Sequence, residues 1–362
     1  MAKTGDQDRV KRQFTRLLMQ WNEGQNRRQM PWKGEKDPYR IWLSEIILQQ
    51  TRVEQGLSYY QRFITNYPTI HHLAGAGDQQ VFKDWEGLGY YSRCRNLLAT
   101  ARFISQNLNG EFPKTYAEVL ALKGIGPYTA AAIASFAFNL PHAVVDGNVF
   151  RVLSRVFGIS VSTSSGEGKK YFTRLANEVL DKKNPGLYNQ AIMDFGATIC
   201  KPLAAGCNEC ALSEICFAHK NNMVASFPVK DKKAPIRKRH FHYLIIEHRG
   251  KIAIRQREDK DIWRHLYEFV LVEDGNEKSV KAVVETAAKN GIIDKKDWAL
   301  VSESPLFKQQ LTHQMISAKF IRLKVARKPE NGFQWISKED IKQYPFPRLI
   351  NNFLESCESE LK

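Results

Sequence analysis

Residues 115–137 have the sequence TYAEVLALKGIGPYTAAAIASFA, which predicts two helices joined by a tight glycine turn. Pro127 stands at the first position of the second helix, where its missing N–H costs nothing. Gly124 and Gly126 permit backbone conformations closed to other residues and leave amide groups bare, so that a phosphate can bind there. The stretch therefore predicts a helix–hairpin–helix that grips a phosphate backbone through Lys123, Gly124 and Gly126, although plain helix connections also use such turns.

The net charge of the chain supports a polyanionic partner. Its 362 residues include 54 Lys and Arg against 38 Asp and Glu, a formal net charge of +16. A surplus of this size is typical of nucleic-acid binding, and the alternative is a charge that serves only solubility. Together with the glycine hairpin, the charge predicts that the protein binds DNA.

Four cysteines stand close together after the helical part. Cys200, Cys207, Cys210 and Cys216 lie within 17 residues, which indicates a metal site. Four thiolates can hold a [4Fe–4S] cluster or a tetrahedral zinc ion. Zinc sites usually use two CxxC pairs, whereas this stretch has one CxxC with wider, unequal arms, so we favour iron–sulfur over zinc. The neighbouring Lys201 is a candidate phosphate contact.

The pattern of apolar residues changes near residue 227. Residues 1–226 are predicted to be helical, with the cysteine loop at 200–216 as their last part. The stretch FPVKDKKAPIRKRH (227–240) has two prolines and six Lys or Arg, which predicts a basic linker. Residues 241–362 contain β-like runs such as HFHYLIIEH and one helix, EKSVKAVVETAAKNG, so we expect an α+β domain there.

Two features bear on the location of the protein. No apolar run approaches the ~20 residues that cross a bilayer, and the N-terminus lacks the apolar core of a secretory signal. Cysteines in a long chain without a signal favour reduced thiols, and Cys94 and Cys357 are expected to be incidental. We expect a cytoplasmic monomer of bacterial type, held at the nucleoid through DNA, with no membrane partner.

Six strings in the chain resemble one known family, the MutY-type adenine DNA glycosylases of the endonuclease III superfamily. The resemblance is continuous from Arg28 to Cys216 and looser beyond. The strings are RRQMPW (27–32), DPYRIWLSEIILQQTRV (37–53), WEGLGYYSRCRNL (85–97), LKGIGPYTAA (122–131), VVDGNVFRV (144–152) and YNQAIMDFGATIC (188–200). The resemblance implies base-excision repair: hydrolysis of the N-glycosidic bond of adenine mispaired with 8-oxoguanine or guanine in duplex DNA.

The implied fold is multi-domain. It consists of an all-helical helix–hairpin–helix glycosylase region, with a six-helix part and a [4Fe–4S] cluster loop, and then a Nudix-like α+β domain. Nudix hydrolases of MutT type need a helix with several Glu residues that bind magnesium. The helix at EKSVKAVVETAAKNG lacks that cluster. We therefore expect the second domain to recognise a lesion rather than to hydrolyse a nucleotide.

Removal of a purine from deoxyribose needs a proton for the leaving base and negative charge near the oxocarbenium-like sugar, and two carboxyl groups in different surroundings can divide these tasks. Glu45 lies in the apolar run IWLSEIILQQT, where burial should raise the pKa of its carboxyl. An exposed or salt-bridged Glu is the alternative. The resemblance places the adenine-protonating acid at Glu45.

Asp146 precedes a predicted helix, where an Asp commonly caps the helix start. Capping amides would also keep this carboxylate ionised, so capping and a catalytic role are compatible. The resemblance assigns Asp146 the stabilisation of the sugar cation, electrostatically or through a covalent bond. It also implies that Asn148 is a hydrogen-bonding partner in the same site.

Tyr128 distinguishes this chain from bifunctional relatives, which have a Lys at this point of the hairpin. That Lys attacks the sugar as an amine nucleophile, and Tyr has no amine. We therefore expect a monofunctional glycosylase, although Lys123 could allow weak strand cleavage. A core aromatic side chain is the alternative interpretation of Tyr128.

The resemblance also implies residues that contact the duplex and the extruded base. Arg28 and Trp32 would line the adenine pocket, and Gln190 stands where some relatives have Glu, although an amide can still read the adenine edge. Gln50 and Tyr90 would reach into the duplex, with Gln49, Thr51 and Leu88 near the partner strand. In the second domain Leu311-Thr312-His313 replaces a common Phe-Ser-His, and Thr312 and His313 are the expected contacts to 8-oxoguanine.

Three other functions remain open at the level of sequence. The first is a glycosylase for oxidised pyrimidines, which Tyr128 and the extra C-terminal domain disfavour. The second is a catalytically silent iron–sulfur protein that binds DNA, which the pair Glu45 and Asp146 disfavours. The third is a Nudix hydrolase with a DNA-binding appendage, which the missing Glu cluster disfavours.

Overall fold

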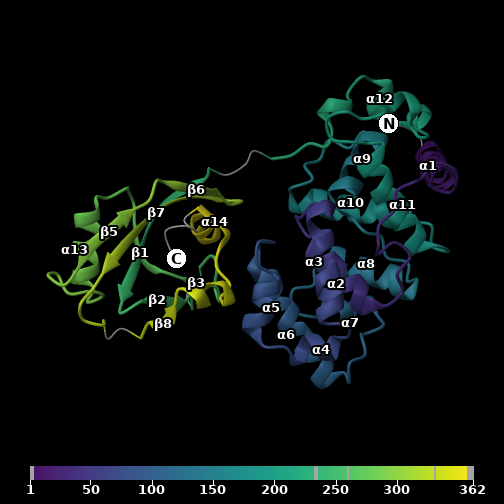
Figure 1. Cartoon of the computed structure of the whole chain (residues 1–362). Helices are drawn as coiled ribbons and strands as arrows, with labels where there is room; N and C mark the ends of the chain where they lie inside the picture. Colours follow the sequence, from purple (N-terminus) through teal and green to yellow (C-terminus); the bar gives the residue numbers. More distant parts are fainter. Residues whose placement is uncertain (1–3, 232–234, 259–260, 330–331, 357–362) are drawn as a thin grey trace. The chain divides into compact units, whose positions relative to one another are not determined.

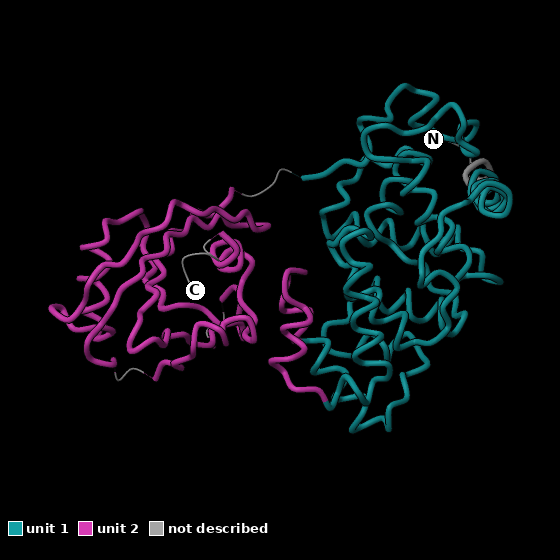
Figure 2. Tube along the Cα trace, viewed as in Figure 1, with its two compact units in different colours: residues 1–75, 96–232 teal, residues 76–95, 233–362 magenta. Residues whose placement is uncertain are grey.

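The chain forms two compact units in the computed structural model, which describes residues 4–231, 235–258, 261–329 and 332–356. Unit 1 comprises Met1–Gly75 and Asn96–Lys232, and unit 2 comprises Ala76–Arg95 and Lys233–Lys362 (Figure 2). Residues 232–234 of the predicted linker and Cys357 lie outside the described residues.

Unit 1 is helical, and its described residues contain no strand. Helix α6 contains the point where the chain returns from unit 2. The helices of unit 1 are α1 (Thr4–Gly24), α2 (Pro38–Leu48), α3 (Val53–Asn66), α4 (Ile70–Gly75), α6 (Tyr91–Asn107), α7 (Tyr116–Leu120), α8 (Pro127–Phe138), α9 (Gly147–Phe157), α10 (Gly166–Glu178), α11 (Pro185–Thr198) and α12 (Phe217–Lys220), with short 3-10 turns at Cys207–Glu209, Ser213–Ile215 and Val224–Ser226 (Figure 1).

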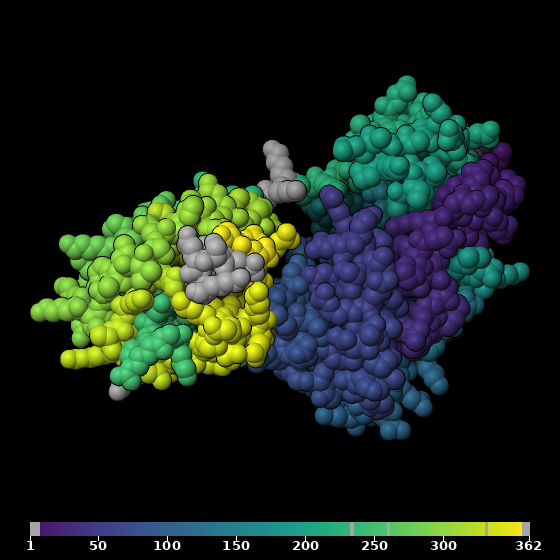
Figure 3. Space-filling view, viewed as in Figure 1, coloured from purple at the N-terminus to yellow at the C-terminus, as the bar shows by residue number. Residues whose placement is uncertain are grey.

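The apolar stripe of the N-terminal helix anchors one side of unit 1. Phe14, Leu18 and Trp21 recur at three- and four-residue spacing on α1 and are buried in the same core as residues of α9, α10 and α11. The Trp21 ring meets Phe195 of α11 edge-on at 4.9 Å. The space-filling view shows the purple N-terminal segment against the teal surface of these later helices (Figure 3).

Small side chains let the second helix of the glycine hairpin, α8, lie buried in unit 1. The residues of α8 from Thr129 to Ser135 are buried, and four of these seven are alanine, so neighbouring helices approach closely. Gly124 has φ +79°, and a Cβ there would meet Asn96 Cβ at 2.5 Å. Gly126 caps α8 and Pro127 is its first residue, as the sequence predicts.

A glycine contact joins helices α9 and α11. A Cβ on Gly196 would lie 2.6 Å from Asn148 Cβ, closer than real Cβ atoms approach, and 3.2 Å from the Asn148 backbone. The two helices can therefore pack with the start of α9 directly against α11 only because residue 196 has no side chain.

Unit 2 contains a mixed sheet. The central strands β1 and β7 are parallel over eleven residue pairs, from Arg237 with Gln314 to Glu247 with Lys324. The other strand pairs are antiparallel. The strand order is β3-β2-β1-β7-β5, and in addition β4 pairs with β1, β6 with β7 and β8 with β2. The elements are α5 (Asp78–Asp84), β1 (Arg237–His248), β2 (Lys251–Gln256), β3 (Tyr267–Glu268), β4 (Val270–Asp274), α13 (Val280–Lys289), β5 (Ala299–Glu303), β6 (Phe307–Gln310), β7 (Gln314–Lys324), β8 (Gln334–Ser337), a 3-10 turn (Glu339–Gln343) and α14 (Arg348–Ser356) (Figure 1).

The two faces of this sheet are covered by different helices. Successive side chains of a strand point to opposite faces. Leu244 and Ile321 pack in one core with Val283 and Val284 of α13. On the other face Phe320 stacks on Phe353 of α14, with ring centroids 4.0 Å apart. Both faces of the central strands are thus buried, which explains the near-continuous apolar run in β1.

The chain segment Ala76–Arg95 belongs to unit 2, although it lies within the helical part of the sequence. Its contacts include a bond of 2.8 Å from the Phe346 backbone N–H to Glu86 Oε1 and one of 3.2 Å from Lys83 Nζ to the Tyr344 carbonyl. The Phe82 ring also meets His265, with centroids 5.9 Å apart. No sequence pattern predicts that this segment belongs to unit 2, because it has the same helical pattern as its neighbours.

The expected fold class, a helical region followed by an α+β domain, is confirmed. The predicted helices at the N-terminus, at IWLSEIIL, on both sides of the glycine turn and at residues 280–289 are all present. No helix among the described residues is long and apolar enough to cross a membrane.

Replacement of Gly196 by Ala should force α9 and α11 apart. Over-packing of a close contact typically costs 1–3 kcal/mol. We expect the free energy of unfolding of Gly196→Ala, measured by urea denaturation, to fall by about that amount. Gly166→Ala is the control, because Gly166 begins α10 and nothing lies within 4 Å of an added Cβ. Equal stability of the two variants would contradict the close contact.

Candidate active site

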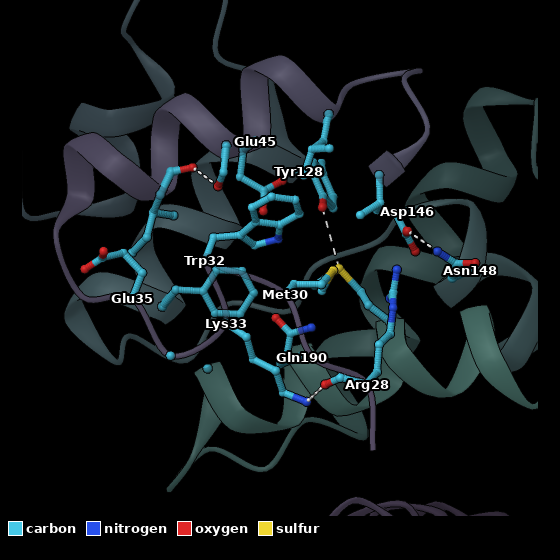
Figure 4. A pocket seen from close by; sticks show the side chains of 18 of the residues that line it. Arg28, Met30, Trp32, Lys33, Glu35, Glu45, Tyr128, Asp146, Asn148 and Gln190 are labelled. Atoms are coloured by element: carbon cyan, nitrogen blue, oxygen red, sulfur yellow. Dashed lines mark hydrogen bonds between the residues drawn. The ribbon is translucent and has the colours of Figure 1, made fainter. Parts of the chain in front are cut away.

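One cavity of about 810 Å³ in unit 1 collects most of the residues that the sequence predicts for catalysis and base binding. Its walls come from the loop after α1, from α2 and its C-terminal turn, and from the first turns of α8, α9 and α11 (Figure 4). Ten predicted residues line it: Arg28, Trp32, Glu45, Gln49, Gln50, Thr51, Tyr128, Asp146, Asn148 and Gln190.

Glu45 is a carboxyl on an otherwise apolar helix. Its neighbours Ser44 and Ile46 are buried, and Glu45 itself is only partly exposed, toward the cavity. Burial raises the pKa of Glu45 to about 7, a hydrogen bond from Tyr128 opposes the rise, and the charge of Asp146 adds to it. The pKa rise expected from the sequence is confirmed, and Glu45 can carry a proton near neutral pH.

Tyr128 lies between the two carboxyl groups. Its side chain hydrogen-bonds Glu45, and its hydroxyl also lies 3.5 Å from the sulfur of Met193 (Figure 4). Burial and the charges of Glu45 and Asp146 raise the pKa of Tyr128 well above its ordinary value. The phenol therefore stays neutral and acts as a hydrogen-bond donor, and it supplies no amine at this point of the hairpin.

Asp146 caps α9. Its Oδ1 accepts from the Val149 backbone N–H at 2.8 Å, and its Oδ2 accepts from Asn148 Nδ2 at 2.8 Å (Figure 4). Burial raises the pKa of Asp146, whereas these hydrogen bonds and the nearby Arg151 guanidinium lower it. The predicted capping role is confirmed, and Asp146 shares the cavity with Glu45 but has far more hydrogen bonds to its charged form.

Arg151 extends this network to the cysteine loop. Its guanidinium donates to Asn148 Oδ1 and to the Gly196 carbonyl, both at 2.7 Å. Its Nε donates to the Cys200 carbonyl, also at 2.7 Å. A short chain of hydrogen bonds thus runs from the backbone of the cysteine loop through Arg151 and Asn148 to Asp146.

Arg28, Lys33, Gln190 and the Trp32 ring also line the cavity, and Figure 4 shows the Trp32 ring next to Glu45 and Tyr128. Arg28, Lys33 and Gln190 share a buried carboxylate, Asp194, and the Trp32 ring meets Tyr60 edge-on at 5.4 Å. Sequence reasoning missed Asp194, Lys33 and three further lining residues, Met30, Leu187 and Met193. Asp194 could have been found by the signal that indicated Glu45, a single carboxyl in an apolar helix.

The residues after α2 form one edge of the cavity. Gln49 Nε2 donates to Thr129 Oγ1 at 3.1 Å, which ties this edge to the hairpin helix. Gln50 is exposed and has φ +55°, in the left-handed region that a residue with a side chain seldom adopts. Strained backbone of this kind is common at functional sites, and here it belongs to a residue that lines the cavity and is exposed to solvent.

The residues predicted to grip phosphate are accessible. Lys123, Gly124 and Lys201 are exposed, and Gly126 is partly exposed at the start of α8. The Lys123 carbonyl accepts from Thr100 Oγ1 at 2.8 Å, which fixes the turn. The bare amides of the α8 N-terminus are available to an anion from solvent.

All four cysteines of the predicted metal site line one further cavity of unit 1. Cys210 interacts electrostatically with the other three thiols. The buried Arg155 donates to Cys200 Sγ at 3.4 Å and to the Lys201 and Pro202 carbonyls at 2.7 and 3.0 Å. As they stand, no three His, Cys, Asp or Glu side chains of the described residues are arranged to hold a metal ion. Cys94 is buried and belongs to unit 2.

Four predicted contact residues belong to unit 2. Thr312 and His313 are exposed in the turn between β6 and β7, and Thr312 Oγ1 lies 2.9 Å from the hydroxyl of Tyr90. Tyr90 is 44 % exposed and has φ +48°, and Arg93 lies over its ring. Leu88 is 5 % exposed, so in this structure its side chain is part of a core.

Comparisons with known proteins agree with this arrangement. Residues 43–179 match the family described as HhH-GPD superfamily base excision DNA repair protein, and residues 242–356 match a NUDIX domain. An adenine DNA glycosylase of Buchnera aphidicola subsp. Baizongia pistaciae is 37% identical over 261 residues, which cover 71% of this chain and 73% of the relative. The chain belongs to the adenine DNA glycosylase family. The expected family and enzyme class, a DNA glycosylase, are thereby confirmed.

Other relatives of this adenine DNA glycosylase family member support the same assignment. The adenine DNA glycosylase of Rattus norvegicus is 42% identical over 217 residues, covering 57% of this chain and 42% of the rat protein. A solved structure of a thermostable thymine-DNA glycosylase is 28% identical, with a TM-score of 0.55 over 59% of this chain and 99% of that chain. A trapped endonuclease III–DNA complex, 21% identical with a TM-score of 0.51 over 59% of this chain and 98% of that chain, shows the shared fold.

The raised pKa of Glu45 should make the stability of this family member depend on pH. Because the folded pKa of about 7 lies above the ordinary value of 4.5, the protonated form stabilises the fold, and this contribution is lost as pH rises from about 4.5 through 7. Glu45→Gln, which stays neutral, should therefore be more stable than the wild type at pH 8, by on the order of 2 kcal/mol, and equally stable at pH 4.5. Urea denaturation at both pH values measures this, and an equal difference at both would contradict a raised pKa.

Proposed function

We propose that the protein excises adenine mispaired with 8-oxoguanine, or with guanine, from duplex DNA in base-excision repair. The observation that carries the proposal is the pair of carboxyl groups in one cavity, Glu45 with a pKa of about 7 and Asp146 with hydrogen bonds from Val149 and Asn148. The family assignment and the DNA-gripping hairpin support the substrate class.

Glu45 would act first, as the general acid. A carboxyl with a pKa of about 7 is protonated often enough near neutral pH to donate and is acidic enough to give up its proton. An adenine in the cavity would receive this proton on its ring, so that it leaves as a neutral molecule. Tyr128 would hold the Glu45 carboxyl in place during the transfer, through their hydrogen bond.

Asp146 would then stabilise the positive charge that develops on the sugar. The Val149 amide and the Asn148 side chain already hold the carboxylate, so little reorganisation is needed when charge develops. Arg151 fixes Asn148 in turn, at 2.7 Å from its Oδ1. Water would then add to the sugar and complete the hydrolysis. Because residue 128 has no amine, we expect a monofunctional enzyme. Lys123 is the expected source of any weak strand cleavage.

The duplex would be held by contacts of two kinds. Backbone phosphates would bind the bare amides at Gly124 and Gly126 and the exposed Lys123 and Lys201. The exposed Gln50 and Tyr90, both with left-handed backbones, would fill the space that the extruded adenine leaves, with Gln49, Thr51 and Leu88 toward the partner strand. The burial of Leu88 makes its backbone, rather than its side chain, the better candidate for that contact.

Recognition of 8-oxoguanine would rest on the turn between β6 and β7 in unit 2. Thr312 offers a hydroxyl that both donates and accepts, and His313 adds a ring nitrogen beside it. The 2.9 Å contact between Thr312 and Tyr90 holds the hydroxyl at the same surface as the duplex-filling aromatic. The Nudix-like domain would therefore read the lesion rather than hydrolyse a nucleotide.

The cysteine loop would hold a [4Fe–4S] cluster. Four sulfur donors face one cavity, which suits the cluster, and Arg155 offers N–H groups that offset thiolate charge. Cys200, Cys207, Cys210 and Cys216 would be the ligands. When bound, the cluster would brace the loop that carries Lys201, and it takes no part in breaking the glycosidic bond.

We further propose that the protein acts as a monomer in the cytoplasm, associated with the nucleoid through DNA, and has no membrane partner. The net charge of +16 supports binding to DNA regardless of sequence, because neutralised phosphates release their counterions.

The proposed reaction predicts a specific pattern of strand breaks. We expect duplexes with adenine opposite 8-oxoguanine to be cut only after alkali opens the abasic site, and duplexes with adenine opposite guanine to be cut in the same way but more weakly. The single-turnover excision rate should fall as pH rises through about 7, because Glu45 loses its proton. Glu45→Gln should bind the duplex but slow excision at least ~100-fold. Cutting of a thymine-glycol duplex without alkali would instead indicate an oxidised-pyrimidine glycosylase, and no cutting at all would indicate a silent binder.

The proposed cluster predicts a defined metal content. Metal and sulfide analysis of the purified protein should find about four iron and about four sulfide per chain. Cys207→Ser should lower both, whereas Cys94→Ser is the matched control and should leave both unchanged, since Cys94 is buried in the other unit. One zinc per chain without sulfide would refute the iron–sulfur assignment.

A further inference from the structure

Asp194 is a carboxylate on α11 whose side chain is fully buried. Its two oxygens receive four hydrogen bonds. Oδ1 accepts from Arg28 Nη1 and from Gln190 Nε2, both at 2.9 Å. Oδ2 accepts from Asn26 Nδ2 at 2.9 Å and from Lys33 Nζ at 3.1 Å.

Three of these four donors line the active-site cavity, while Asp194 itself stands behind them. Arg28 and Lys33 come from the loop after α1, and Gln190 lies one helical turn before Asp194 on α11. Arg28 and Lys33 keep about a quarter of their side chains exposed, at 25% and 24%. Removal of Asp194 would therefore leave two cations that water can still solvate, rather than buried unpaired charges.

The bond to Asp194 fixes the orientation of the Gln190 amide. A carboxylate only accepts hydrogen bonds, so the amide nitrogen must face Asp194. The amide is planar, and its oxygen then points away from Asp194. Because Gln190 lines the cavity, its Oε1 faces the cavity (Figure 4).

We propose that Asp194 is a positioning residue that makes the pocket selective for a base with an exocyclic amine, by holding Gln190 with its oxygen toward the base. The inference rests on the proposed adenine excision and deepens it. The 6-amino group of adenine donates a hydrogen bond to an acceptor, whereas an unconstrained Gln190 amide could rotate and present its nitrogen instead. A purine without the amine gains nothing from this acceptor.

The test compares two substrates that differ only in the amine. Both duplexes carry 8-oxoguanine, opposite adenine in one and opposite unsubstituted purine in the other. The readout is the single-turnover excision rate of adenine divided by that of purine. Loss of one neutral hydrogen bond in the transition state lowers this ratio about three- to tenfold. A structural defect that lowers both rates together leaves the ratio unchanged.

Asp194→Leu removes the acceptors and keeps a side chain branched at Cγ, and Gln190→Ala removes the amide. Each should lower the ratio about three- to tenfold, and the double variant should lower it no further than Gln190→Ala alone. Asp194→Ala also removes both acceptors and provides the same test if the Leu variant does not fold. Asn189→Ala is the matched control: Asn189 is a fully buried polar neighbour on α11 that bonds Ser135, His142 and Val144, and its loss should lower stability without changing the ratio.

Two results would overturn the inference. An unchanged ratio in both Asp194 variants would show that Asp194 serves only the fold. An equal fall in the ratio with and without Gln190 would show that Asp194 does not act through the amide. The wild-type protein tests the proposed function separately. If it releases adenine, either of these two results contradicts the inference alone. If it releases neither base, the proposed function and the inference are both contradicted.

Discussion

The cost of removing the Glu45 carboxyl from water is the constraint on which the site depends. A helix with Ile41, Trp42, Leu43, Ile46 and Ile47 buried can hold such a group only if it is neutral or compensated. The fold supplies one hydrogen bond from Tyr128 and no salt bridge to Glu45 is found among the described residues. The carboxyl therefore retains its proton to a pH at which most carboxyls are charged, which is what an acid in a neutral solution needs.

Asp146 is also a buried carboxyl group of this cavity, but its surroundings differ from those of Glu45. It stands at a helix start where backbone amides point at it. The packing of α9 on α11 at Gly196 places Asn148 beside it, and Arg151 holds Asn148. The two carboxyl groups in one cavity thus differ in their surroundings, because Glu45 lies in the middle of a helix and Asp146 accepts hydrogen bonds at a helix start.

Much of this could be predicted from the sequence, for reasons specific to each element. The glycine turn, Pro127 and the apolar stripe of α1 are local signals, and the structure has the corresponding helices. Glu45 was found because a carboxyl in an apolar run conflicts with its surroundings. Lys33 and Met30 were missed because loop residues carry no periodicity. The strands β5, β6 and β8 were missed because runs of four or five residues are too short to show a clear alternation. The membership of residues 76–95 in unit 2 depends on long-range pairing that no local pattern encodes.

Because residues 76–95 belong to unit 2, the protein cannot be divided into its two units at one point of the chain. The backbone passes between the units at residues 75–76, 95–96 and 232–233, so a single cut in the linker does not separate them. A fragment ending at residue 232 would retain Phe82, Glu86 and Tyr90 but lose His265, Phe346 and Thr312, with which they interact. Such a fragment would leave the segment that carries Tyr90 without these partners. Removal of the C-terminal residues is therefore expected to affect the rest of the chain through residues 76–95, and not only through the missing domain.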